Sequence, residues 1–228
     1  MRAVATVVAF AQEGALAVPA LDATALACDV LGPGDDLFRR LKRSNPGSLL
    51  LLLAADADEP ALAGAAKAAR ILRKRGGGEV LLVLPPADAN PGPSGRARLR
   101  RAARLTETCV VQPVGRASSS DAVRCFVEPL SIFGLVGVDP VEVRRLARGG
   151  SFALLHVEQK GLEQALSFPG VREVLLTCRL RPSATLREVD EPVARLRELA
   201  PKGAHLVFAG PEVPAADEGP RSICAVLY

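Results

Sequence analysis

Residues 48–84 read SLLLLLAADADEPALAGAAKAARILRKRGGGEVLLVL, and this stretch decides the fold class. The apolar runs at 48–54 and 79–84 are nearly continuous, as in strands of a parallel sheet that is covered on both faces. Between them, Asp58-Glu59-Pro60 supplies an N-cap acid and an early proline for a helix over 61–75, and three glycines follow that helix. The stretch therefore predicts a strand, a crossover helix and a second strand.

The same alternation extends over the rest of the chain. Strands are predicted upstream at 5–10 and 24–30 and downstream at 108–114. Helices are predicted over 94–107 and from 118 onward to Pro129, which should end or kink its helix because it lacks an N–H. Beyond Gly134 the units shorten, with helices over 140–148, 160–167 and 186–199 and strands at 152–157, 172–180, 205–209 and 223–227.

Residues 128–143, EPLSIFGLVGVDPVEV, resemble the end of the core helix and the synergy loop of the tubulin/FtsZ family, whose pattern reads I-x-x-P-G-L-I-N-x-D-x-x-D-V. Other family motifs have weaker counterparts in the same order: GEVLLVLP at 78–85, GRARLRRA at 95–102, SFALL at 151–155, GVREVLL at 170–176, LREVDE at 186–191 and AHLVFAG at 204–210. The chain thus resembles a shortened and divergent FtsZ-like protein.

The resemblance implies an α/β fold in two parts. The first, residues 1–134, is expected to be a degenerate GTPase-like domain with a parallel, Rossmann-like sheet. The second, residues 135–228, is expected to be a smaller α/β domain of the FtsZ type. The boundary is predicted near 133–139, where the pattern of the elements changes.

The two phosphate-binding loops of the family are degenerate here. The position of the first, after the first strand, carries Gln12, Glu13 and Gly14, with a single glycine. The position of the second reads AADADEP over 54–60, so Asp56 and Asp58, with Glu59, replace the family's glycines. Such loops bind phosphate through backbone N–H groups, and carboxylates repel it. We expect no bound cofactor and no GTP hydrolysis by this chain.

The synergy loop keeps its acids. Asp139 and Glu142 match the two family acids that reach the nucleotide of a neighbouring subunit, whereas Gly137 occupies the position of the family's asparagine. The resemblance implies that the two acids are a vestigial catalytic pair. The local interpretation, which we favour, is that Asp139, Pro140 and Glu142 form an N-terminal capping box, because they have its spacing.

Two other functions remain open. Asp56, Asp58 and Glu59 could gather Mg²⁺ for a phosphohydrolase-type reaction, or they could be an N-cap and solvated first-turn acids. The arginines at 96, 98, 100, 101 and 104 could bind nucleic acid, or they could form a solvated helix face. We favour the second interpretation in both cases.

Composition limits the remaining possibilities. The 228 residues are 49% hydrophobic and 4% aromatic, with no apolar run long enough for a membrane span and no signal-peptide pattern, so we expect a cytoplasmic protein without membrane contact. The five cysteines lack metal-binding spacing and are expected to be buried thiols, with no metal site. His156 and His205 are expected in strands, without a catalytic partner. The predicted partner is an FtsZ-like filament or a second copy of the chain.

Overall fold

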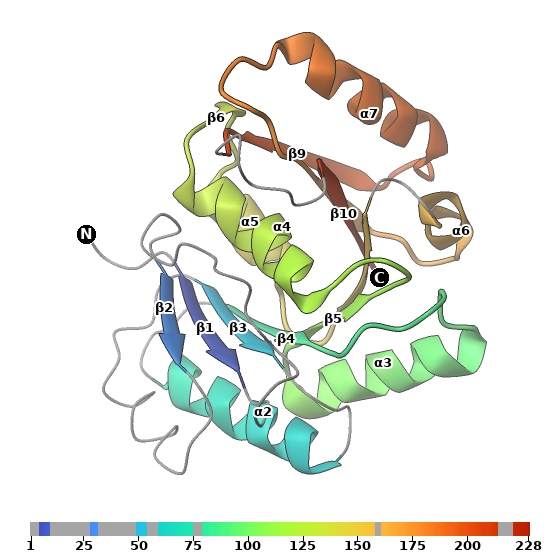
Figure 1. The fold of residues 1–228 in the computed structure, drawn as a ribbon. Coiled ribbons are helices and arrows are strands. Elements are labelled where there is room, and N and C mark those ends of the chain that lie inside the picture. Colours follow the sequence, from blue (N-terminus) through green and yellow to red (C-terminus); the bar gives the residue numbers. More distant parts are fainter. Residues whose placement is uncertain are drawn as a thin grey trace.

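A computed structural model describes residues 5–9, 28–31, 49–53, 59–74, 79–157, 161–213 and 221–228. The elements of this part of the chain are β1 (Ala5–Ala9), β2 (Cys28–Leu31), β3 (Leu49–Leu53), α2 (Glu59–Arg73), β4 (Glu79–Val83), α3 (Pro93–Thr106), β5 (Cys109–Pro113), α4 (Ser119–Ser131), β6 (Gly134–Val136), α5 (Pro140–Leu146), β7 (Phe152–Val157), α6 (Leu162–Ser167), β8 (Glu173–Cys178), α7 (Leu186–Leu199), β9 (His205–Pro211) and β10 (Ser222–Leu227). The described strands are linked in the order β2-β1-β3-β4-β5-β7-β10-β8-β9-β6 (Figure 1).

The first five strands in this order are parallel to one another. Their sequence order, 2-1-3-4-5, is that of a doubly wound sheet whose topological switch point lies between β1 and β3. The register pairs Ala9 with Leu53, so β1 and β3 end side by side at the same edge. The predicted parallel, Rossmann-like sheet is confirmed.

The second part of the sheet is mixed. Strand β7 continues the parallel direction beside β5, pairing Phe152 with Val110. The last strand of the chain, β10, then inserts between β7 and β8 and is antiparallel to both. Strand β9 is parallel to β8, and the short β6 closes the order antiparallel to β9. A smaller α/β unit therefore follows the parallel strands, while the boundary at residue 134 stays a prediction.

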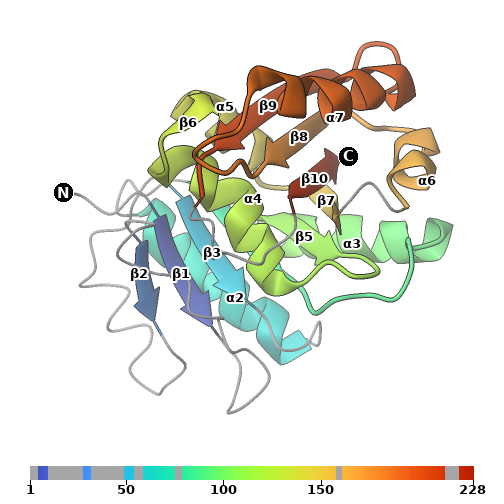
Figure 2. The ribbon, with the colours of Figure 1, turned by 45° about the horizontal axis from the view of Figure 1, so that its top comes forward.

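Alternate side chains of the sheet enter two separate hydrophobic clusters. In β4, Val80 and Leu82 face the cluster formed with α2, α3, α6 and α7, whereas Leu81 and Val83 face the cluster formed with α4 and α5. This two-residue period is the reason for the near-continuous apolar run of β4, because this strand is covered on both faces. Helix α4 lies in the middle of the molecule, between β1–β3 and β9–β10 in both views (Figures 1 and 2).

Helix α4 begins as its sequence predicts and continues past Pro129. Ser118 caps it, and the backbone N–H of Ser118 donates to Asp121 at 2.8 Å. Of the two predicted effects of Pro129, an end of the helix is not observed, since α4 continues to Ser131, and a kink stays a prediction. Pro129 cannot donate to the carbonyl of Cys125, one helical turn earlier. The hydroxyl of Thr177 in β8 donates to that carbonyl at 3.0 Å, which offsets the missing bond.

Candidate functional site

The connection between α4 and α5 contains the residues that resemble the synergy loop. Its strand β6 is the last strand in the sheet order. Ile132 and Val138 pack against the core cluster of α4 and α5, whereas Phe133 is 88% exposed and Leu135 is 41% exposed. The alternation is that of an extended strand with one face turned to solvent. Strand β6 was not predicted because three residues give too short a signal, although the alternation over 132–138 contains it.

The backbone of β6 approaches β9 very closely. The peptide N–H of Glu212 donates to the carbonyl of Phe133 at 3.0 Å. A Cβ atom placed on Gly134 would lie 2.0 Å from the carbonyl oxygen of Gly210, a distance that no side chain tolerates. Gly134 is therefore required for this edge strand to pair, and the pairing holds Phe133 and Leu135 in place.

Asp139 and Glu142 lie at the start of α5. The carboxylate of Asp139 accepts a hydrogen bond of 2.7 Å from the backbone N–H of Val141, so Asp139 is the N-cap. The reciprocal bond of a capping box is not formed in this part of the structure. Glu142 instead places its carboxylate 3.9 Å from the imidazole Nε2 of His205 in β9. The capping interpretation is thus correct for Asp139 and for Pro140 at the start of the helix but not for Glu142, and neither carboxylate is buried.

Two further positions complete this surface. Val141 is 58% exposed on the first turn of α5. Gly137 is exposed, and a Cβ atom there would meet nothing within 4 Å. We call Phe133, Leu135, Asp139 and Val141 the 133–141 edge. It combines three exposed apolar side chains with one exposed carboxylate on a connection of nine residues.

The predicted phosphate loops follow two strands that end next to each other. In the sequence, residues 12–14 come after β1 and residues 54–58 after β3, and these two strands flank the topological switch point where doubly wound sheets bind ligands. Gln12, Glu13, Gly14, Asp56 and Asp58 lie outside the described residues. Of the three acids that follow β3 in the sequence, Glu59 alone belongs to the described residues, as the first residue of α2.

No group of three or more His, Cys, Asp or Glu side chains that could hold a metal ion is found within the described ranges. This finding does not reach Asp56 and Asp58, so the Mg²⁺ hypothesis for those residues is untested. The same ranges contain no helix long and apolar enough to cross a membrane.

Two of the arginines of α3 contact aromatic rings of other elements. The guanidinium of Arg96 lies 3.9 Å from the ring centroid of Phe168 and donates to the carbonyl of Pro91 at 3.0 Å. Arg100 lies 5.7 Å from the ring centroid of Phe152. Such contacts are cation–π interactions that hold α3 against the rest of the fold. Their aromatic partners are distant in sequence, which is the reason that the sequence analysis did not find them.

Four cysteines are buried and the two histidines lie in strands, as predicted. Cys109, Cys125, Cys178 and Cys224 are buried and form no disulfide. Burial raises the pKa of the Cys109 thiol to about 11. His156 is buried within β7, whereas His205 lies at the start of β9. These residues belong to the structure of the sheet.

A buried ion pair links α4 to the end of β8. Arg179 Nε lies 2.8 Å from a carboxylate oxygen of Glu128, and both side chains are almost fully buried. The two residues are 51 positions apart, so no local signal in the sequence could pair them. This pair and the bond from Thr177 attach the central helix to the second part of the sheet.

No protein-family model and no curated protein matches the sequence. Solved structures do match its fold. An FtsZ dimer of M. jannaschii is similar over 98% of this chain and 87% of its own, with a TM-score of 0.61 and 14% identity. A GTPγS-bound protofilament of CetZ2 from Haloferax volcanii is similar over 98% and 92%, with a TM-score of 0.54 and 13% identity. A mutant FtsZ of M. jannaschii is similar over 88% and 76%, with a TM-score of 0.53 and 16% identity. The chain therefore has the tubulin/FtsZ fold, as the resemblance in its sequence predicted.

Proposed function

We propose that this chain, which has the tubulin/FtsZ fold, is a non-catalytic protein that assembles with or regulates a cytoskeletal or cell-division filament in the cytoplasm. Its 133–141 edge is the docking surface, and its partner is an FtsZ-like filament or a second copy of the chain. The matched solved structures include a dimer and a protofilament, which supports a role in assembly. A shared fold does not determine function, so the proposal depends on the surface itself.

The exposure of Phe133 is the observation that carries the proposal. Its neighbours Ile132 and Val138 are packed inward, yet the aromatic ring of Phe133 is 88% exposed. The fold gains almost nothing from an aromatic residue there. Burying such a side chain against a partner contributes about 1.5–3 kcal/mol, or about ten- to a hundredfold in association. Aromatic side chains in such positions are common anchors of protein interfaces.

The carboxylate of Asp139 adds a negative charge to the 133–141 edge. It is exposed beside the apolar side chains and is oriented by its bond to the N–H of Val141. In the family that the sequence resembles, an acid at this position reaches the nucleotide of the next subunit. The same geometry supports contact between Asp139 and the nucleotide-binding face of a partner filament.

The absence of catalysis is proposed from the residues that follow β3. In place of a glycine-rich turn, the sequence has the three acids Asp56, Asp58 and Glu59, and then Pro60, which has no N–H to donate. Carboxylates in this position repel a triphosphate. A subunit that does not hydrolyse GTP has no reaction to drive its disassembly, so its polymers should be static.

Co-sedimentation tests both halves of the proposal. The purified chain should pellet, alone or with a purified FtsZ-like protein from the same organism, to the same extent with GTP, with GDP and without nucleotide. Phe133→Ser should abolish pelleting, whereas Phe133→Leu, which keeps an apolar side chain, should retain it. Thermal unfolding should be unchanged in both variants, because the ring is exposed.

Two outcomes would contradict the proposal. GTP-dependent self-assembly, with release of inorganic phosphate by the chain alone, would show that it is catalytic. Undiminished pelleting of a correctly folded Phe133→Ser variant would show that the docking surface lies elsewhere.

A further inference from the structure

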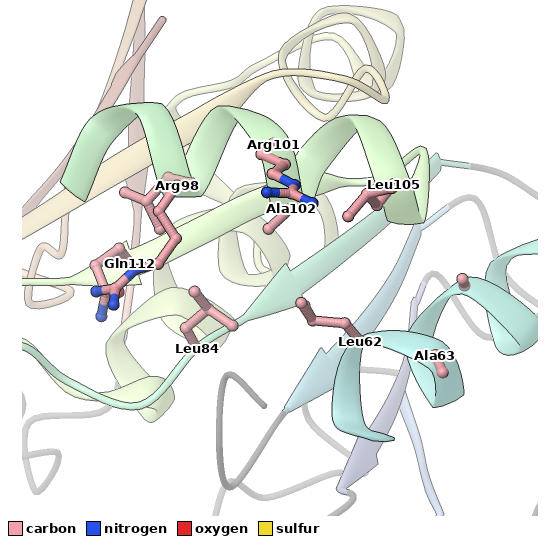
Figure 3. Close-up of a pocket in the computed structure, with 10 residues that line it drawn as sticks. Leu62, Ala63, Leu84, Arg98, Arg101, Ala102, Leu105 and Gln112 are labelled. Atoms are coloured by element: carbon pink, nitrogen blue, oxygen red, sulfur yellow. The ribbon is translucent and has the colours of Figure 1, made fainter. Parts of the chain in front are cut away.

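A groove of about 490 Å³ lies between α2 and α3, over the ends of β4 and β5 (Figure 3). Its volume falls within the range of about 300–1,000 Å³ that is typical of small-molecule sites. It is on the α2–α3 face of the sheet and shares no residue with the 133–141 edge.

Small side chains create the groove. Ala66 of α2 and Ala102 of α3 face it, so neither helix fills the space with a large side chain. Leu84, which follows β4, and Leu99 of α3 are both buried in the core and form an apolar floor. Leu62 of α2 adds to this apolar lining (Figure 3).

The polar groups of the groove are two arginines and an amide. Arg98 and Arg101 are exposed, and within the described part of the chain neither has an ion pair, a hydrogen bond or a cation–π contact, whereas Arg96 has a hydrogen bond and Arg100 a cation–π contact. With a spacing of three residues they lie on the same side of α3. The amide Nε2 of Gln112 donates to the carbonyl of Pro85, which fixes this side chain near Arg98 (Figure 3).

We infer that the groove binds a small amphiphilic anion, with its apolar body on the floor and its carboxylate or phosphate head between Arg98 and Arg101. The guanidinium group forms two parallel hydrogen bonds to either head group. Charge complementarity selects an anion over a cation. The apolar floor selects an amphiphile over inorganic phosphate or a nucleic-acid backbone, which would leave that floor in contact with water.

Isothermal titration calorimetry on the purified chain tests this inference with decanoate and decyl phosphate as probes, both below their micelle concentrations. Each should bind with a stoichiometry of one, whereas decyltrimethylammonium, which has the same chain and the opposite charge, should not bind. Binding of decanoate alone or of decyl phosphate alone would support the groove and identify the head group as a carboxylate or a phosphate.

Variants locate the binding to the groove. The double variant R98Q/R101Q should weaken binding about tenfold or more, because hydrogen bonds to charged groups are among the strongest in proteins. Arg104→Gln, on the same helix but outside the groove, should leave the affinity unchanged. Ala66→Phe should block the apolar floor and weaken binding of both probes, with its fold checked by circular dichroism.

The inference is overturned if neither anion binds with a stoichiometry of one, or if R98Q/R101Q binds as tightly as Arg104→Gln. The result is independent of the proposed function. A Phe133→Ser variant that no longer assembles should still bind decanoate with unchanged affinity.

Discussion

Thr177→Val should destabilise the fold because it removes the hydroxyl that compensates for Pro129. The Thr177 hydroxyl is fully buried and donates to the carbonyl of Cys125 at 3.0 Å. Valine has nearly the same shape, so packing is conserved and the carbonyl loses this donor. A buried acceptor without a partner costs about 1–3 kcal/mol. For a chain of this length, each kcal/mol lowers the melting temperature by about 2–4 °C.

The test is a double-mutant cycle with Pro129→Ala. Alanine restores a backbone N–H one helical turn after Cys125, and this N–H can donate to the same carbonyl. In the Pro129→Ala background, Thr177→Val should therefore cost less than about 1 kcal/mol. The coupling between the two positions should be about 1–2 kcal/mol, within the range measured for residues that share a partner.

Urea denaturation, followed by circular dichroism at 222 nm, gives the four unfolding free energies of the cycle. The slope of the unfolding free energy against urea concentration must be the same in all four proteins for the comparison to hold. An equal cost of Thr177→Val in both backgrounds would refute the reasoning, because it would show that the hydroxyl and the proline act on different groups. The single variant Thr177→Ser, which keeps the hydroxyl, is the matched control.

Three other predictions follow from buried groups and close approaches. Glu128→Gln should lower the unfolding free energy by about 1.5–3 kcal/mol in a urea titration, because it removes the carboxylate charge that pairs with the buried Nε of Arg179, and a double-mutant cycle with Arg179→Met should show coupling between the two positions. Gly134→Ala should cost about 1–3 kcal/mol in the same assay through the clash with β9, and Gly137→Ala less than about 0.5 kcal/mol. The Cys109 thiol, whose pKa burial raises from 9.0 to about 11, favours the folded state only while it is protonated, so stability should fall between pH 9 and about pH 11, and Cys109→Ser should reduce this loss.

Local signals in the sequence were sufficient to find most elements. The predicted strand at 152–157 and the predicted helix over 186–199 match β7 and α7 residue for residue. Both elements depend on near neighbours: an uninterrupted apolar run forms the first, and in the structure Thr185 and Glu188 form a capping box at the start of the second. The N-cap at Asp139 was found in the same way.

Contacts between residues that are far apart in the sequence could not be predicted from local patterns. The stacking of Arg96 on Phe168 and the pairing of Glu128 with Arg179 join residues that are 72 and 51 positions apart. The insertion of β10 between β7 and β8 also could not be predicted, because strand order depends on which apolar faces meet. For the same reason the sequence did not reveal the groove between α2 and α3.

The sequence by itself determined the alternation of strands and helices, the order of the family motifs and the replacement of phosphate-binding glycines by acids. These are properties of neighbouring residues, governed by hydrogen-bond geometry and by the period of apolar side chains. Only the tertiary structure decided that Phe133 points into solvent, that Thr177 compensates for Pro129, and that Arg98 and Arg101 flank an apolar groove. The exposure of a side chain, the replacement of a missing hydrogen bond and the formation of a cavity depend on which distant segments pack together. Packing is a property of the whole chain.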